Sequence, residues 1–168
     1  LTFYLMPMVH WSESMSTYDT TDKILFSNDA FGSFGALDGA IFNDEANLNI
    51  FENEMRRYYS NIVGKLGAPV NAILKKLSSV EISCICPSHG LVWRKYIKEI
   101  IERYQKWANM EATKEGVVIV YGSMYGHTAE MAEVLGRELG NRGIKDVIIY
   151  DSSKTDHSYI FSTIWRYK

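Results

Sequence analysis

The chain has 168 residues, of which 46% are hydrophobic, 13% aromatic and 23% charged. This composition is typical of a globular protein and excludes a disordered chain, and the two cysteines are too few for a disulfide scaffold. The 18 basic and 20 acidic residues nearly balance, which does not indicate a nucleic-acid-binding protein, and no apolar run reaches the roughly 20 residues of a membrane span.

The pattern of apolar residues predicts alternating strands and helices in the first part of the chain. Short apolar or alternating runs predict strands at residues 1–9 (broken by Pro7), 23–28 and 81–86. Apolar positions three and four residues apart predict helices at residues 47–64, 68–79 and 91–108. Polar and glycine-rich segments predict loops at residues 10–22 and 30–39.

The second part of the chain has a different pattern. A strand, a helix and a second strand are predicted at residues 116–122, 127–141 and 146–151. Met131, Leu135 and Leu139 are expected to lie on the inward face of this helix. This order predicts a βαβ unit with parallel strands. We place a domain boundary near residue 112, within the polar linker 109–115, which divides the chain into domains 1–112 and 113–168.

The two ends of the sequence are unlike natural termini. The chain opens at Leu1 in an apolar run that lacks the charged segment and cleavage site of a secretory signal. It closes in the apolar-rich segment 160–168. Because natural termini are usually polar and exposed, we expect the sequence to be the middle of a longer protein.

Two small groups of charged residues stand out. Asp44 and Glu45 lie just before a predicted helix, where acidic side chains complement the helix dipole. Arg94, Lys95 and Lys98 form a modest basic cluster on a predicted helix, interleaved with apolar residues. Neither group indicates a nucleic-acid partner.

Cys84 and Cys86 form a C-x-C pair in a predicted strand. Alternation along the strand places both thiols on one face, a full pleat apart, where they cannot easily form a disulfide with each other. We interpret them as small buried hydrophobic residues without a redox role.

The segment 122–128, with the sequence GSMYGHT, follows a predicted buried strand and opens a helix. Backbone N–H groups and the positive end of the helix dipole converge there, and the hydroxyls of Ser123 and Thr128 add donors. Gly126 allows the chain to curl closely around a ligand, so the segment suits a phosphate group. It has neither the lysine of a Walker loop nor the GxGxxG spacing, and an ordinary capped turn is the alternative interpretation.

This segment, placed after the strand VVIVY, resembles the phosphate loop of flavodoxins, which binds the phosphate of FMN. The resemblance implies that FMN is bound by Ser123, Met124, Tyr125, Gly126, His127 and Thr128. Flavodoxins more often have asparagine at the position of His127, whose ring can still donate a hydrogen bond.

Three potential metal ligands lie in the first part of the chain. His10, Asp29 and His89 each follow a predicted strand, where loops from several strands can converge on one site. Imidazole and carboxylate ligands suit iron, zinc or manganese. The alternative for each residue is a structural role within its loop, such as capping or hydrogen bonding.

The motifs MVHW, SNDAFG and CPSHG, followed by the start of a flavodoxin, together resemble the flavodiiron proteins. In that family a metallo-β-lactamase-like domain is fused to a flavodoxin-like domain. The resemblance implies an α/β fold, with the C-terminal half of a metallo-β-lactamase-like αββα domain over residues 1–112. The first βαβ unit of a flavodoxin-like, doubly wound parallel sheet is implied over residues 113–168.

The resemblance also implies a centre of two non-haem iron ions. His10 would bind one iron, Asp29 would bridge both, and His89 would bind the other. The H-x-E-x-D-H cluster of the family, which supplies further ligands, does not occur in this sequence. Because three side chains are too few to hold two irons, the 168-residue chain by itself is expected to be inactive.

For the whole protein the resemblance implies a cytoplasmic oxidoreductase that reduces dioxygen to water, nitric oxide to nitrous oxide, or both. Electrons would pass from rubredoxin or a flavin reductase to FMN and then to the diiron centre. A head-to-tail homodimer or a tetramer is expected, with no membrane and no nucleic-acid partner. The alternatives are a zinc hydrolase of the metallo-β-lactamase class and an inactive truncated chain that binds FMN or a partner.

Overall fold

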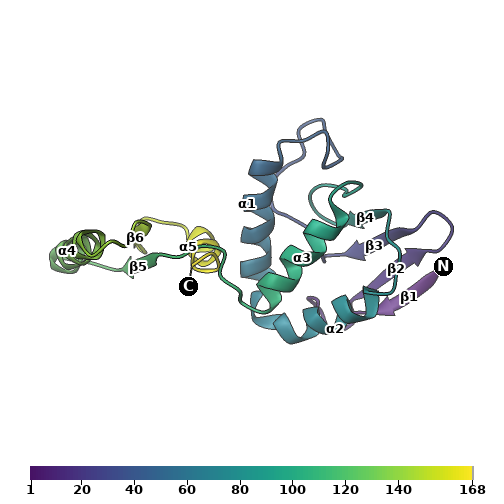
Figure 1. Cartoon of the computed structure of the whole chain (residues 1–168), viewed down its shortest axis with the longest axis horizontal. Coiled ribbons are helices and arrows are strands. Elements are labelled where there is room, and N and C mark those ends of the chain that lie inside the picture. Colours follow the sequence, from purple (N-terminus) through teal and green to yellow (C-terminus); the bar gives the residue numbers. More distant parts are fainter. Residues whose placement is uncertain (168) are drawn as a thin grey trace. The chain divides into compact units, whose positions relative to one another are not determined.

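The computed structural model describes residues 1–167, which divide into two compact units, Leu1–Met110 and the residues from Glu111 onward (Figure 1). Both units combine strands with helices, which confirms the predicted α/β class. The assignment of these units to a diiron domain and an FMN domain stays a prediction. None of the described helices is long and apolar enough to cross a membrane.

The first unit is built on a four-stranded sheet with the order β1-β2-β3-β4. Its strands are β1 (Thr2–Leu5), β2 (Met15–Asp19), β3 (Ile24–Asn28) and β4 (Cys84–Pro87). The pairs β1–β2 and β2–β3 are antiparallel, whereas β3 and β4 are parallel. Parallel neighbours end at the same edge of a sheet, so the loops after β3 and β4 emerge side by side.

Strand β2 lies in a segment that the sequence predicts to be a loop, and this prediction is wrong. Met15–Asp19 pairs with β1 on one side and with β3 on the other. Its buried side chains are Ser16 and Tyr18. A buried serine carries no hydrophobic signal, so the apolar pattern does not reveal the alternation of this strand.

Helical structure continues from residue 48 to residue 77. It consists of α1 (Leu48–Tyr58), a π-helical turn (Tyr59–Val63), a 3-10 turn (Gly64–Leu66) and α2 (Gly67–Leu77). The interruption predicted between the helices 47–64 and 68–79 does not occur, because Gly64 and Gly67 have helical dihedral angles. Gly67 instead allows a close approach, since a Cβ there would collide with the backbone carbonyl of Ala108.

The core of the first unit combines side chains of the sheet with side chains of the helices. The fully buried apolar residues include Leu25 and Ile85 from the strands and Met55, Tyr59, Val70 and Tyr104 from the helical segments. The Tyr104 ring packs against those of Tyr59 and Phe31, with centroids 5.0 and 4.5 Å apart. Burial of such large side chains stabilises the unit.

The helix predicted at residues 91–108 begins later than expected, as α3 (Ile97–Ala108). The residues before it are extended: Val92 forms a bridge with Phe42, and Trp93 forms a bridge with Ile85. Tyr96 then adopts the left-handed region, with φ of +60°, immediately before the helix. The backbone pairing of this segment depends on residues far away in sequence, which helical spacing does not reveal.

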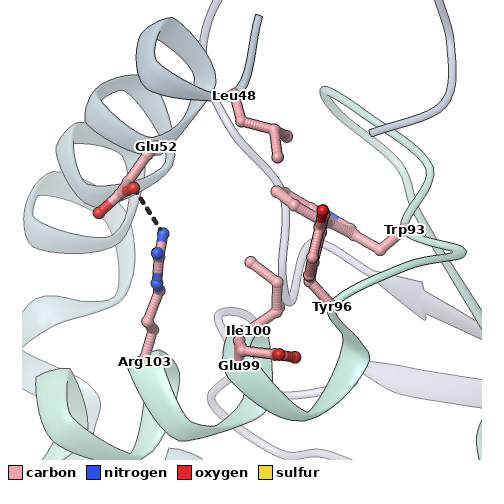
Figure 2. Close-up of a pocket in the computed structure, with 7 residues that line it drawn as sticks. All are labelled: Leu48, Glu52, Trp93, Tyr96, Glu99, Ile100 and Arg103. Carbon is pink, nitrogen blue, oxygen red and sulfur yellow. Dashed lines mark ion pairs between the residues drawn. The ribbon is translucent and has the colours of Figure 1, made fainter. Parts of the chain in front are cut away.

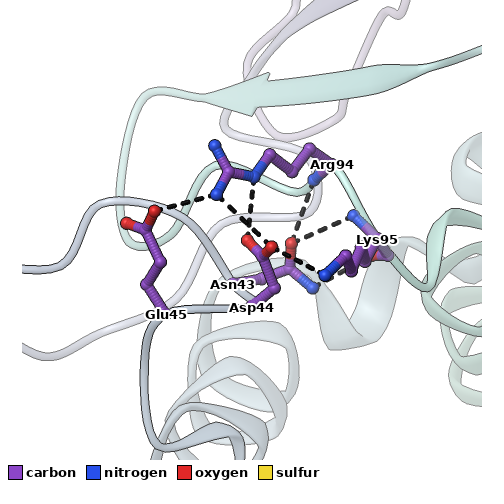
Figure 3. A network of polar contacts seen from close by, with 5 residues as sticks. All are labelled: Asn43, Asp44, Glu45, Arg94 and Lys95. Carbon is purple, nitrogen blue, oxygen red and sulfur yellow. Dashed lines mark hydrogen bonds and ion pairs between the residues drawn. The ribbon is translucent and has the colours of Figure 1, made fainter.

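A polar network joins the segment before α1 to the segment before α3 (Figure 3). The Asn43 side-chain oxygen accepts hydrogen bonds from the backbone N–H groups of Arg94 (3.0 Å) and Lys95 (3.1 Å). The Arg94 guanidinium pairs with Asp44 (2.9 Å) and Glu45 (2.8 Å), and Lys95 pairs with Asp44 (3.0 Å). The two acids therefore hold two loops together, which corrects their predicted role at a helix dipole.

This network makes stability depend on pH in the acid range. Hydrogen bonds from Arg94, and then from Lys95, hold the pKa of Asp44 below its ordinary 3.8. The stabilising contribution is therefore complete above that value and is lost as pH falls through the lower pKa of the folded state. We expect Arg94→Gln to flatten the fall of the free energy of unfolding between about pH 5 and about pH 3, measured by urea denaturation. The control is Lys98→Gln, which should leave the slope unchanged, and an unchanged slope in Arg94→Gln would contradict the assignment.

The second unit contains the predicted βαβ arrangement. Its elements are β5 (Val117–Tyr121), α4 (His127–Asn141), β6 (Val147–Asp151) and α5 (His157–Ile164). Strands β5 and β6 are parallel neighbours, as predicted. Helix α5 was not predicted, since the sequence analysis described only the apolar-rich segment 160–168 in this part of the chain.

The predicted inward face of α4 is wrong at Met131 and Leu135, whereas Leu139 is half-buried. Met131 and Leu135 are 71% and 50% exposed, whereas Ala132 and Gly136 are buried. A Cβ on Gly136 would lie 2.6 Å from the Ile149 side chain. The helix lies so close to the strands that small residues form its contact face, and the large apolar residues point elsewhere.

Candidate metal centre

The candidate ligand His10 lies in a tight loop between β1 and β2. Backbone hydrogen bonds close the loop: Met6 N–H donates to the carbonyl of Ser14 (2.8 Å), and Met8 N–H donates to that of Trp11 (2.7 Å). The rings of His10 and Trp11 are 5.3 Å apart between centroids. The position of the imidazole is therefore defined by the loop and by an adjacent ring.

The candidate ligand Asp29 directly follows β3. Its turn is held by the Ser27 hydroxyl, which donates to the carbonyl of Ala30 (2.7 Å), and by Gly32 N–H, which donates to the carbonyl of Asp29 (3.2 Å). The Asp29 side chain is only 12% exposed. A carboxylate so far out of water needs charged or hydrogen-bonding partners.

The candidate ligand His89 lies in the turn after β4. Two backbone hydrogen bonds tie this turn to the loop that carries Asp29. Ser33 N–H donates to the carbonyl of His89 (3.2 Å), and Ser88 N–H donates to the carbonyl of Asn28 (2.8 Å). The two loops therefore form one framework, in which the parallel pairing of β3 and β4 places their residues together.

The structure brings all three predicted ligands together around the Asp29 carboxylate. Nε2 of His10 lies 3.3 Å from Oδ2 of Asp29. Nε2 of His89 lies 3.4 Å from Oδ1 of the same carboxylate. The side chains of His10 and His89 are 25% and 57% exposed, so the site is reached from solvent on the His89 side.

The candidate donor set consists of two imidazoles, from His10 and His89, and the carboxylate of Asp29. Each carboxylate oxygen faces a different imidazole, which is compatible with a carboxylate that bridges two metal ions. Within residues 1–167, no group of three or more His, Cys, Asp or Glu side chains is arranged so that it could hold a metal ion. His10, Asp29 and His89 thus form two pairs that share one carboxylate.

Tyr58 is a neighbour of this site that the sequence did not single out. Its ring lies 6.0 Å from that of His89 between centroids. Burial, and then the charge of Asp29, raise the pKa of the Tyr58 hydroxyl well above its ordinary value. The Tyr58 hydroxyl therefore stays protonated and neutral, with its ring next to that of His89. In the sequence it belongs to the apolar stripe of a helix, and no local pattern separates it from Tyr59.

A cavity of about 490 Å³ opens beside His89. Its wall combines two loops and one helix residue: Ser33, Phe34, Gly35, Tyr58, Ser88, His89 and Gly90. His89 lines this cavity and also faces Asp29, so a small molecule that enters the cavity meets one of the three candidate ligands.

A second cavity, of about 190 Å³, is lined by residues of α1 and of the segment around the start of α3 (Figure 2). It contains aromatic side chains, Trp93 and Tyr96, and an ion pair of 2.9 Å between Arg103 and Glu52. The charges of that ion pair already compensate each other, and none of the three candidate ligands lines this cavity.

The predicted phosphate-binding residues lie in the exposed loop between β5 and α4. Gly126 has φ of +91°, and its N–H donates to the Ser123 hydroxyl (3.0 Å), which shapes the loop. Met124 and Tyr125 are 86% and 83% exposed. His127 begins α4, whose first N–H groups have no partners within the helix. The loop is therefore open to an anion at a helix N-terminus.

Comparison with known proteins supports a relationship over the whole chain. A family model described as ODP family beta lactamase matches residues 1–90. An uncharacterized protein of Methanocaldococcus jannaschii is 41% identical over 98% of this chain and 41% of its own length. An anaerobic nitric oxide reductase flavorubredoxin of Vibrio vulnificus is 38% identical over 100% of this chain and 34% of its own length.

Solved structures are similar over almost the same range. The rubredoxin oxygen:oxidoreductase of Desulfovibrio gigas has a TM-score of 0.92 and 32% identity, with 99% of this chain and 42% of that chain covered. The flavodiiron protein of Giardia intestinalis has a TM-score of 0.87 and 31% identity, with 96% and 39% covered. These comparisons confirm the resemblance to flavodiiron proteins. The chain spans between 34% and 42% of the length of these relatives.

Proposed function

Because the chain belongs to the ODP family of β-lactamase-like proteins, we propose that it forms part of a flavodiiron oxidoreductase. The proposed reaction is the reduction of dioxygen to water, of nitric oxide to nitrous oxide, or of both. The observation that carries the proposal is the Asp29 carboxylate, which turns one oxygen toward His10 and the other toward His89. The names of the relatives from Vibrio vulnificus and Desulfovibrio gigas support both substrates.

In this proposal His10 binds one iron, Asp29 bridges both irons and His89 binds the second. When bound, the two irons supply redox electrons and open positions for a diatomic substrate. The chain's own contribution is to hold one negative charge, largely out of water, between two imidazoles. Tyr58 presents a neutral ring and hydroxyl next to His89, at the cavity through which substrate would arrive.

The phosphate of FMN is proposed to lie on the loop before α4. The binding residues are Ser123, Met124, Tyr125, Gly126, His127 and Thr128. The support is the positive φ of Gly126, the exposed loop and the free N–H groups at the start of α4. FMN would receive electrons from rubredoxin or a flavin reductase. The name of the Desulfovibrio gigas relative supports a rubredoxin-type donor.

The remaining parts of the proposal concern the whole protein. The whole protein is proposed to form a head-to-tail homodimer or a tetramer. Both cysteines are free, which suits a reducing compartment such as the cytoplasm. The 168-residue chain alone is expected to be inactive, since its three candidate ligands cannot saturate two irons. A zinc hydrolase is the competing function, but the named relatives are reductases.

One experiment distinguishes these functions. The whole protein is purified, its iron, zinc and FMN contents are measured, and the reduced protein is mixed with dioxygen or nitric oxide. We expect about two irons and one FMN per polypeptide, with rapid consumption of at least one of the two gases. A protein that contains zinc without iron, and that consumes neither gas, would overturn the reductase proposal.

The phosphate loop can be tested by removing its hydroxyls. Combined Ser123→Ala and Thr128→Ala substitutions should weaken FMN binding about tenfold to a hundredfold, because hydrogen bonds to a charged phosphate are lost. Binding of riboflavin, which lacks the phosphate, should not change. Fluorescence titration of the whole protein after removal of its flavin measures both affinities. The matched control is Asn141→Ala at the opposite end of α4, and unchanged FMN affinity in the double variant would exclude the loop.

A further inference from the structure

Phe31, two residues after Asp29, has an unusual backbone conformation for a buried aromatic residue. It has φ of +66°, in the left-handed region, and its side chain lies in the core. A bulky residue rarely adopts this region, and turns that require it normally have glycine at that position. Such a conformation persists only where the surrounding structure holds it in place.

Two buried aromatic side chains hold both polar groups of the Phe31 backbone. Its N–H donates to the hydroxyl of Tyr104 in α3 (2.7 Å), and its carbonyl accepts from the indole N–H of Trp93 (3.2 Å). The Phe31 ring also packs on the Tyr104 ring. Phe31, Tyr104 and Trp93 are all buried inside the first unit, so these contacts do not depend on what covers its surface in the whole protein.

The conformation of Phe31 sets the position of Asp29 relative to His89. Gly32 N–H donates to the carbonyl of Asp29 (3.2 Å), which closes a turn with Phe31 inside it, and Ser33 N–H then reaches the carbonyl of His89 (3.2 Å). A Cβ on Gly32 would lie 3.1 Å from each of these two carbonyl oxygens, so the loops are in close contact here. A change in the Phe31 backbone angles would therefore move the two candidate ligands relative to each other.

We infer that Tyr104 is a positioning residue of the candidate metal centre. By accepting the hydrogen bond of Phe31 N–H, it fixes the turn that directs one Asp29 oxygen toward His10 and the other toward His89. Trp93 supports the same peptide group from its carbonyl side. This inference rests on the proposed function, because it concerns how the chain holds a ligand of the proposed iron centre.

The first test measures the turn itself, in the whole protein without metal. Tyr104→Phe removes the hydroxyl and keeps the ring, so the core stays filled. We expect hydrogen exchange of the Phe31 amide to become at least about tenfold faster, because a buried N–H loses its acceptor. The matched control is Tyr59→Phe, which removes a hydroxyl from the same aromatic cluster while Phe31 keeps its acceptor. An unchanged exchange rate of Phe31 in Tyr104→Phe would overturn the inference.

The second test measures whether the turn positions Asp29. Cobalt(II) serves as a spectroscopic probe, titrated into the whole protein after removal of its metal and flavin. Tyr104→Phe should weaken cobalt binding about tenfold to a hundredfold, as loss of an outer-shell group does, and should shift the visible absorption because the ligand geometry changes. Riboflavin binding to the same variant should not change.

A general loss of stability must be separated from a loss of positioning. Leu77→Ala leaves a cavity at the end of α2 and destabilises the first unit, while the Phe31 backbone keeps both hydrogen bonds. It should retain wild-type cobalt affinity and absorption. Equal losses in Leu77→Ala and Tyr104→Phe, or wild-type cobalt binding in Tyr104→Phe, would overturn the positioning role and leave the metal centre intact. Absence of cobalt binding by the unaltered protein would overturn the metal centre as well.

Discussion

Replacing Asp29 by alanine is expected to remove the iron centre from the whole protein while FMN remains bound. The carboxylate faces both candidate imidazoles, at 3.3 Å from His10 and 3.4 Å from His89. Its loss removes a ligand from each proposed iron at once. Because loss of even an outer-shell partner weakens metal binding by tenfold to a hundredfold, loss of a bridging ligand should weaken it by more than about a hundredfold.

The fold should survive this change. The loops that carry Asp29 and His89 are tied by backbone hydrogen bonds, such as that from Ser33 N–H to the His89 carbonyl, which an alanine side chain does not disturb. Metal analysis and the visible spectrum of FMN are read on the same sample, together with thermal unfolding. The matched control is Asp22→Ala, an exposed aspartate on the turn between β2 and β3. Full retention of both irons in Asp29→Ala would refute the bridging role.

The second large effect is expected from Gly67→Ala, which should destabilise the first unit by about 1–3 kcal/mol. Gly67 begins α2 at the point where this helix meets the end of α3. An added Cβ would collide with the backbone carbonyl of Ala108, so one helix must move. The added Cβ would collide with backbone atoms and not with the flexible end of a side chain. Rotation of a side chain therefore cannot relieve the clash.

Urea denaturation of the chain measures this effect in the transition of the first unit. The control is Gly140→Ala in α4, where no atom lies within 4 Å of the added Cβ. That substitution should stabilise the second unit by up to about 1 kcal/mol, because alanine is the better helix former. The same chemical change should thus have opposite signs at the two positions. A neutral or stabilising Gly67→Ala would show that α2 and α3 can separate at this point without loss of packing.

Local patterns predicted those elements whose apolar residues repeat at a regular interval. The βαβ arrangement of the second unit is confirmed, since β-branched strands and a long amphipathic helix are strong local signals. The strand Met15–Asp19 was missed because a serine fills one of its two buried positions. The helix start at Ile97 was misplaced because Trp93 and Tyr96 extend the helical spacing into a segment that instead forms backbone bridges with Phe42 and with Ile85 of β4.

The sequence by itself determined the α/β class, the order of most elements and the residue types that suit a metal ion and a phosphate. These properties depend on periodicity and on side-chain chemistry, which are local. Only the tertiary structure decided that His10 and His89 face opposite oxygens of Asp29, that Tyr58 lies beside them, and that the half-buried thiols of Cys84 and Cys86 lie 3.8 Å apart. Such positions depend on strand register and loop contacts between distant residues, and no spacing within one segment encodes them.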